Sequence, residues 1–241
     1  MKIISRPATS ILLAAALLPC VVPVFVQAGE SATVRLRKVT GNETERLENV
    51  ATILNELMAA RDNAIPKELI DNAAALILIP SVKKGAFIFG GEFGRGVVIV
   101  RQKNGSWGSP GFVTLKGGSF GFQAGGETTD LVLVVKNRSG IQKLSKNQFK
   151  LGVDASVAAG PVGRSASANT DAQMKAKILA YSRSQGLFAG ISLEGGTIKL
   201  DDDANIAVYG RKLNGKDVLE SRFQRTEASN NLYVALGNTK K

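Results

Sequence analysis

The apolar residues of this chain change their spacing near Ala75, and that change restricts the folds open to it. Upstream, apolar residues recur at intervals of three and four, as on one face of a helix. That face consists of Leu47, Val50, Ile53, Leu54, Leu57 and Met58. Downstream, apolar residues come in short runs of strand length, beginning with the run at 76–79. The 26 glycines among 241 residues suit the many tight turns of a β structure.

The predicted strands follow one another closely and are joined by turns. They cover residues 76–79, 86–89, 96–101, 111–115, 118–123, 130–136, 150–159, 176–183, 187–193 and 197–200. Asn104-Gly105 favours a hairpin between two of them. Helices are expected from a capping box at Thr40, from Pro66 to about residue 72, over 141–149 and 201–209, and over 216–236 with a loop at 229–231.

The order of these elements lacks the alternation of strands and long helices that builds a parallel sheet. The predicted class is therefore α+β. We expect a mostly antiparallel β-sheet, or a partly closed barrel or sandwich, with N-terminal and C-terminal helices.

Residues 1–28 have the features of a secretory signal peptide. Lys2 and Arg6 precede an apolar stretch over 11–18, and Val26-Gln27-Ala28 fits the small-x-small cleavage rule. We predict a flexible basic arm over 29–44 and a single domain over 45–241. Lipidation at Cys20, as in a bacterial lipoprotein, is an alternative that the preceding proline disfavours. Either route exports the protein to the periplasm or the medium, where it can associate with a membrane.

The residue inventory excludes most catalytic chemistry. The chain has no histidine, so Ser-His-Asp triads and imidazole metal sites cannot form. Its one cysteine, Cys20, lies in the predicted leader. The G-x-S-x-G pattern at 117–121 therefore lacks the histidine base that a nucleophile elbow needs. We expect no catalytic residues, no enzyme activity and no cofactor. Asp201, Asp203 and Asn205 imitate the start of a calcium loop and form a weak candidate cation site.

The charge balance points to an anionic partner. There are 31 basic and 20 acidic residues, a net charge of +11. No acidic residue occurs between 131 and 153, whereas basic residues recur there. We predict that headgroups of an anionic phospholipid membrane contact Lys83, Lys84, Lys136, Arg138, Lys143, Lys146 and Lys150. A merely solvated basic face is the alternative. Nucleic acid is not expected as a partner, because aromatic residues make up only 6% of the chain.

Several ordered blocks resemble the SYLF domain, the lipid-binding module of the yeast actin-patch proteins. They are residues 65–66, 75–80, 85–96, 105–110, 121–130, 151–154, 159–164 and 181–195, followed by Asn205 and Tyr209-Gly210. The resemblance covers about residues 45–212. Arg164 and Arg183 lie in these blocks and join the candidate headgroup contacts. Arg164 has the alternative of pairing with Asp154 or Glu194.

The resemblance implies non-catalytic binding of anionic phospholipids, because eukaryotic relatives bind phosphoinositides. The predicted export indicates the secreted bacterial branch of the family, acting at the cell envelope. Actin binding is implied only by analogy with the yeast members, and actin is not an expected partner after export. The alternative is a structural or protein-interaction role in the periplasm, with an envelope protein as partner and no specific lipid ligand.

Overall fold

The computed structural model describes most of the chain from Gly41 onward. The described residues are 41–59, 65–84, 92–117, 119–120, 128–163, 171–221 and 223–237. The predicted leader, the predicted arm up to residue 40, the predicted strand over 86–89 and Arg164 lie outside these ranges.

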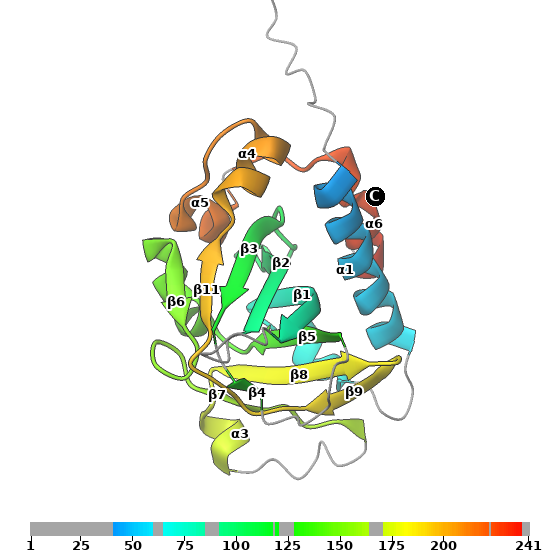
Figure 1. Ribbon diagram of the computed structural model, residues 1–241, viewed down its shortest axis with the longest axis vertical. Coiled ribbons are helices and arrows are strands. Elements are labelled where there is room, and N and C mark those ends of the chain that lie inside the picture. The colour runs from blue at the N-terminus through cyan, green and yellow to red at the C-terminus, as the bar shows by residue number, and fades with distance from the viewer. Residues whose placement is uncertain are drawn as a thin grey trace, which may run out of the picture. The chain divides into compact units, whose positions relative to one another are not determined.

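Nine described strands form one curled sheet that is almost entirely antiparallel (Figure 1). The strand order is β6-β11-β3-β2-β1-β5-β8-β7, and β9 also pairs with β8. The strands are β1 (Ala75–Lys84), β2 (Glu92–Val100), β3 (Gly111–Lys116), β5 (Thr129–Val135), β6 (Gln148–Lys150), β7 (Val157–Ala159), β8 (Ile178–Ser184), β9 (Leu187–Gly190) and β11 (Thr197–Leu200). Within the described ranges, only β7 and β8 pair in parallel. A separate ladder joins β4 (Ser119–Phe120) to β10 (Leu193–Glu194).

Helices at both ends of the described chain complete the fold and confirm the predicted α+β class. They are α1 (Gly41–Ala59), α2 (Lys67–Asp71), α3 (Asp171–Lys175), α4 (Asp202–Tyr209), α5 (Gly215–Glu220) and α6 (Asn230–Ala235). Short 3-10 turns are η1 (Arg138–Gly140), η2 (Gln142–Lys146) and η4 (Glu227–Ser229). The N-terminal α1 and the C-terminal α6 lie against each other (Figure 1). None of the described helices is both long enough and apolar enough to cross a membrane.

The sheet is apolar on both faces, because successive side chains of a strand point in opposite directions. On β1, Leu76 and Leu78 face α1 and α6, and we call this side the helix face. Ile77 and Ile79 face a second core, built with η2, β6 and α5, on what we call the far face. This double burial explains why the central strands read as unbroken apolar runs, such as Leu131–Val135 on β5.

Helix α1 covers part of the helix face with the apolar stripe that its spacing predicts. Leu47, Val50 and Leu54 are among its buried residues, each 1% exposed or less. Met58, predicted on the same stripe, is instead 46% exposed, and it lines a cleft with Ile70 and Trp107. The helix begins at Gly41, so residues 41–44 form its first turn rather than the end of a flexible arm.

Other elements differ locally from the predicted ones. The strand expected to end at Pro80 continues to Lys84 through an irregular register. The helix expected over 141–149 is the 3-10 turn η2 followed by β6. Most of the strand expected over 150–159 is a turn, and only its last residues form β7. The loop expected at 229–231 falls between α5 and η4, since η4 and α6 are continuous there.

Glycine allows three strands to pack tightly around one tyrosine. Tyr181 on β8 is fully buried, and burial raises the pKa of its hydroxyl. A Cβ built on Gly160 would lie 1.9 Å from Cζ of Tyr181. A Cβ built on Gly190 would lie 2.0 Å from the carbonyl oxygen of Gly160. Neither position has room for a side chain. Close approach of neighbouring atoms therefore explains why both residues are glycine.

We expect Gly160→Ala to lower the free energy of unfolding by about 1–3 kcal/mol, because the new methyl overlaps a buried ring. Urea denaturation followed by circular dichroism measures this change. Gly41→Ala is the matched control, since no atom lies within 4 Å of a Cβ there. Equal stability of the Gly160 variant and the wild type would contradict this packing.

The Tyr181 hydroxyl has no hydrogen-bond partner in the described structure. We expect Tyr181→Phe to raise the free energy of unfolding by up to about 1 kcal/mol, because it removes an unpaired buried polar group. Tyr233→Phe is the control. It should lower the free energy of unfolding, because the Tyr233 hydroxyl donates to the Gly108 carbonyl at 2.9 Å. Denaturant titrations of both variants test the pair, and a clear loss of stability in Tyr181→Phe would count against it.

Candidate functional site

The strand register aligns a row of side chains across five strands. Lys150 on β6 lies opposite Thr197, and Thr197 lies opposite Lys116. Lys116 lies opposite Phe93, and Phe93 lies opposite Lys83 on β1. Directly opposed residues of antiparallel strands project to the same face. The row therefore places three lysines and one aromatic ring side by side.

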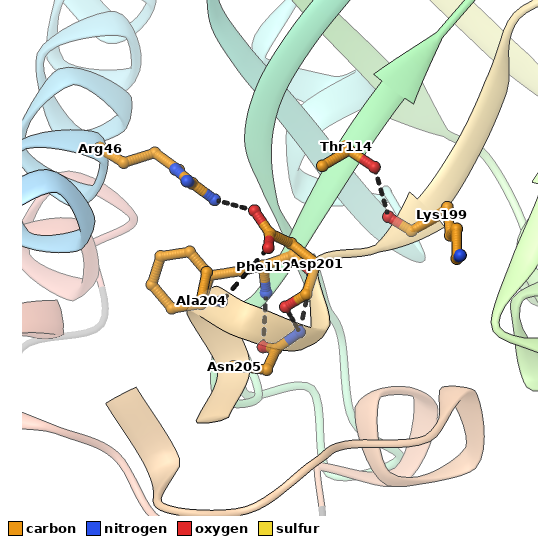
Figure 2. Close-up of polar contacts among 7 residues, drawn as sticks. All are labelled: Arg46, Phe112, Thr114, Lys199, Asp201, Ala204 and Asn205. Carbon is orange, nitrogen blue, oxygen red and sulfur yellow. Dashed lines mark hydrogen bonds and ion pairs between the residues drawn. The ribbon is translucent and has the colours of Figure 1, made fainter. Parts of the chain in front are cut away.

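A second row runs beside the first, two residues along each strand. It consists of Gln148, Lys199, Thr114 and Arg95. The side chains of Lys199 and Arg95 are exposed, like those of the lysines in the first row. Figure 2 shows Lys199 beside Thr114, whose hydroxyl donates to the Lys199 carbonyl at 3.5 Å. We call the two rows together the cationic face, and its charged members are Lys83, Arg95, Lys116, Lys150 and Lys199.

The cationic face is the uncovered continuation of the helix face. Along β3, Phe112 is buried in the helix-face core, Thr114 is half-buried and Lys116 is exposed. The three side chains point the same way, because they are two residues apart. Phe93, on β2, is 41% exposed among the cations. The same side of the sheet thus changes from apolar packing to a charged surface where the helices end.

A β-bulge in β1 brings Lys83 onto this surface. Ile79 and Val82 both pack into the far-face core although they are three residues apart. The register shifts between them, and Ser81 adopts a φ of 51°. An extra residue in one strand reverses the alternation beyond it. Lys83 therefore points to the helix face, where an unbulged strand would place Val82.

The bulge is held by a carboxylate on the neighbouring strand β5. The backbone N–H of Ser81 donates to Oδ1 of Asp130 at 2.9 Å. The other oxygen of Asp130 binds the guanidinium of Arg183 on β8. Arg183 also binds Glu56 of α1, with Nε 2.9 Å from Oε2. Burial acts to lower the pKa of Arg183, but its bonds to Glu56 and Asp130 outweigh that effect and the pKa is raised.

A cleft of about 410 Å³ opens between the first half of α1 and the bulge, beside the cationic face. It is lined by Asn42, Glu45, Arg46, Asn49, Pro80, Ser81, Lys83, Phe93, Gly94 and Arg95. The Arg95 guanidinium lies 5.9 Å from the centre of the Phe93 ring. The cleft thus combines cations, neutral hydrogen-bonding groups and one aromatic wall.

The N-terminal part of α1 is fixed at this cleft by the junction in Figure 2. Arg46 donates to Oδ2 of Asp201 at 3.0 Å, and its guanidinium lies 5.2 Å from the centre of the Phe112 ring. Asp201 also caps α4 by accepting from the N–H of Ala204 at 3.2 Å. Asn205 is fully buried and bonds the backbone of Phe112 through both amide atoms.

The bonds of this junction involve two of the three residues of the weak candidate cation site, Asp201 and Asn205. Asp201 is committed to Arg46 and to the helix cap, and Asn205 to backbone groups, while Asp203 is exposed. Among the described residues, no three acidic side chains are placed to hold a metal ion together. The residues therefore form a structural junction between α1, β3 and α4.

The structure separates the predicted headgroup contacts into four groups. Lys83 and Lys150 lie on the cationic face. Lys143 and Lys146 are exposed on η2, whose Leu144 packs into the far-face core. The side chain of Lys84 lies outside the described structure, like Arg164.

The remaining predicted contacts make intramolecular bonds. Lys136 donates to the carbonyls of Gln173 and Met174 at the end of α3, both at 3.0 Å. Arg138 donates to the carbonyl of Arg101 at 2.8 Å. Arg183 binds two carboxylates, as described above. These three side chains stabilise the fold, and a basic run in the sequence does not distinguish such residues from a binding surface.

Sequence reasoning missed Arg95, Lys116, Lys199 and Phe93 as members of the site. The signal that could have found them is alternation at strand ends, where polar or aromatic residues replace the apolar ones of one face. The patterns are Phe93-x-Arg95, Thr114-x-Lys116 and Thr197-x-Lys199. Recognising that these three segments lie side by side needs the strand order, which the sequence alone does not supply.

Comparison with known proteins finds one family model and several relatives. The Ysc84 family model, described as "Las17-binding protein actin regulator", matches residues 116–239. The LAS seventeen-binding protein 3 of Saccharomyces cerevisiae is 36% identical over 185 residues, which is 76% of this chain and 40% of the relative. The human SH3 domain-containing YSC84-like protein 1 is 31% identical over 176 residues, 73% of this chain and 51% of the relative. The chain thus spans about half or less of the length of these relatives.

The network around Asp130 leads to a prediction about stability. We expect Asp130→Ala to lower the free energy of unfolding by about 2–4 kcal/mol, because it leaves Arg183 without one carboxylate and Ser81 without its acceptor. It should also speed hydrogen exchange at the Ser81 amide. Urea titration and exchange mass spectrometry measure the two effects.

Asp203→Ala is the matched control, because Asp203 is an exposed acid in the first turn of α4. Its cost should stay below about 1 kcal/mol, the range of a helix-terminus charge. Similar losses in the two variants, with Ser81 still protected, would show that Asp130 does not hold the bulge.

Proposed function

Since this chain belongs to the Ysc84 family of Las17-binding actin regulators, a family of binding and regulatory modules, we propose that it is a non-catalytic module that binds anionic phospholipid surfaces through its cationic face. The cationic face is the observation that carries the proposal. Its two rows hold five cations, one exposed aromatic ring and no carboxylate.

The physics of this surface suits adsorption to a charged membrane. A lysine or arginine near an anionic bilayer contributes roughly 1 kcal/mol, and the attraction fades within a Debye length of about 10 Å at 0.1 M salt. Neighbouring strands are about 4.8 Å apart, so five adjacent strands present the cations over a patch about 20 Å wide. The proposal is that these five cations contact one membrane surface together. Phe93 supplies an aromatic ring of the kind that lies at the headgroup level.

The proposed location is the bacterial cell envelope. It rests on the signal-peptide features of residues 1–28, with the lipidation of Cys20 as the less favoured route. In that location, actin would not be available as a partner. The lipid would be an anionic phospholipid rather than the phosphoinositides of eukaryotic relatives.

A second candidate function is protein binding without lipid. The name of the yeast relative describes binding to LAS seventeen, and the family description repeats this. The matched part is only 40% of that relative's length, so its binding activity can reside elsewhere in it. For this chain, an envelope protein that copurifies with it in the absence of lipid would support this function.

Vesicle sedimentation tests the lipid proposal. The full chain should pellet with phosphatidylglycerol vesicles, release as salt increases, and remain in solution with phosphatidylcholine vesicles. Lys116→Gln combined with Lys199→Gln should weaken binding about 30-fold, the effect of removing two cations at about 1 kcal/mol each.

Lys143→Gln combined with Lys146→Gln is the matched control, because it removes the same charge from η2. It should weaken binding less than about threefold, through net charge alone. Equal losses in the two double variants would show that net charge acts and not the cationic face. Equal binding to both kinds of vesicle, or to neither, would discard the proposal.

A further inference from the structure

The cleft beside the cationic face has the charge of a site for a single monoanion. Lys83 and Arg95 line it, and neither forms an ion pair or hydrogen bond with another described residue. Arg46 adds a third cation, which is bound to Asp201. Glu45 adds a carboxylate to the lining. Three cations against two carboxylates leave one net positive charge.

The neutral groups of the cleft favour a ligand that carries hydroxyl groups. Asn42 and Asn49 have exposed amide side chains that both donate and accept hydrogen bonds. The backbone N–H of Ser81 is used by Asp130, so a ligand in the cleft could bond Ser81 only through its hydroxyl or its carbonyl oxygen. Glu45 can accept a hydrogen bond from a ligand hydroxyl. A bare phosphate would leave most of these groups bonded to water alone, whereas a ligand with hydroxyl groups could bond several of them.

The apolar part of the lining includes a member of the cationic face. Phe93 and Pro80 form it, and Phe93 also belongs to the first row of the cationic face. A lipid bound in the cleft could therefore place its headgroup among the polar groups of α1 and its glycerol backbone against the Phe93 ring. The volume of about 410 Å³ admits one headgroup and its waters.

We infer that this cleft binds one phosphodiester headgroup that bears hydroxyl groups, of the phosphoglycerol class. The inference rests on the proposed function and names the ligand of the same surface. A phosphodiester carries one negative charge and matches the cleft. A phosphate monoester carries close to two and leaves the cleft negative. A choline headgroup carries no net charge and has no hydroxyl to donate. The same diester could come from a lipid or from a free metabolite.

Titration calorimetry with water-soluble probes tests the cleft directly on the full chain. Glycerophosphoglycerol should bind with a stoichiometry of one, whereas glycerophosphocholine and inorganic phosphate should bind at least about tenfold more weakly, the cost of the unmatched charge or hydrogen bonds. Equal binding of the three probes, or binding of none, would overturn the inference.

Variants distinguish the cleft from the rest of the surface. Asn49→Ala is a mild change on an exposed position of α1, and it should reduce affinity for glycerophosphoglycerol about fivefold. Arg95→Gln should reduce it about tenfold or more. Lys143→Gln, on η2, should leave it unchanged. If all three variants fold and their affinities for glycerophosphoglycerol fall by the same factor, the inference is overturned.

Vesicles separate this inference from the proposed function and identify the source of the diester. At matched surface charge, phosphatidylglycerol vesicles should retain more protein than phosphatidic acid vesicles, and Asn49→Ala should remove that preference. Equal retention by both would refute the headgroup site while the proposed function stands. Binding of glycerophosphoglycerol without binding to any vesicle would refute the proposed function and identify a free diester as the ligand.

Discussion

Helix α1 is held against the sheet by an apolar stripe along its length and by an ion pair near each end. Leu47, Val50 and Leu54 belong to the stripe, and burying such a side chain contributes about 1.5–3 kcal/mol. Arg46 binds Asp201 near the N-terminal end, and Glu56 binds Arg183 near the C-terminal end. The position of α1 decides which part of the helix face is covered. The uncovered part is the cationic face, and the first half of α1 forms one wall of the cleft beside it.

The same strands build both the core and the candidate binding surface. A sheet buried on two faces needs apolar residues at every position of its centre, and β1 and β5 supply them. Charged side chains on the helix face can then occur only toward the ends of strands, beyond the helices. Lys116 and Arg95 lie there, and burial at the other ends of the same strands fixes the backbone that carries them. A rigid sheet thus presents cations at regular spacings without side-chain contacts among them.

Charge is distributed unevenly between the two layers of the fold. Helix α1 carries Glu45, Glu48 and Glu56 on its less buried sides, whereas the neighbouring uncovered strands carry cations. The two layers meet at the cleft, where Glu45 of α1 lies in the same lining as Lys83 and Arg95. The charge of the cleft therefore differs from that of the cationic face as a whole.

The sequence by itself determined the class of fold and the short list of possible chemistries, and it predicted an anionic partner. Periodicity identified α1 and the central strands, because the 3.6-residue and two-residue repeats follow directly from backbone geometry. The missing histidine excluded the common catalytic sites, because those sites need an imidazole as base or as metal ligand. The net charge of +11 favoured an anionic ligand.

Only the tertiary structure decided which cations lie together on one face of the sheet. The basic run at 136–150 is continuous in the sequence, yet folding directs Lys136 and Arg138 to backbone carbonyls and leaves Lys150 beside residues from distant strands. Lys83 joins that face because one extra residue at the β1 bulge reverses the alternation, held by Asp130 from another strand. Both outcomes depend on strand order and register, which are set by contacts between residues far apart in the chain. A local pattern contains no information about such contacts.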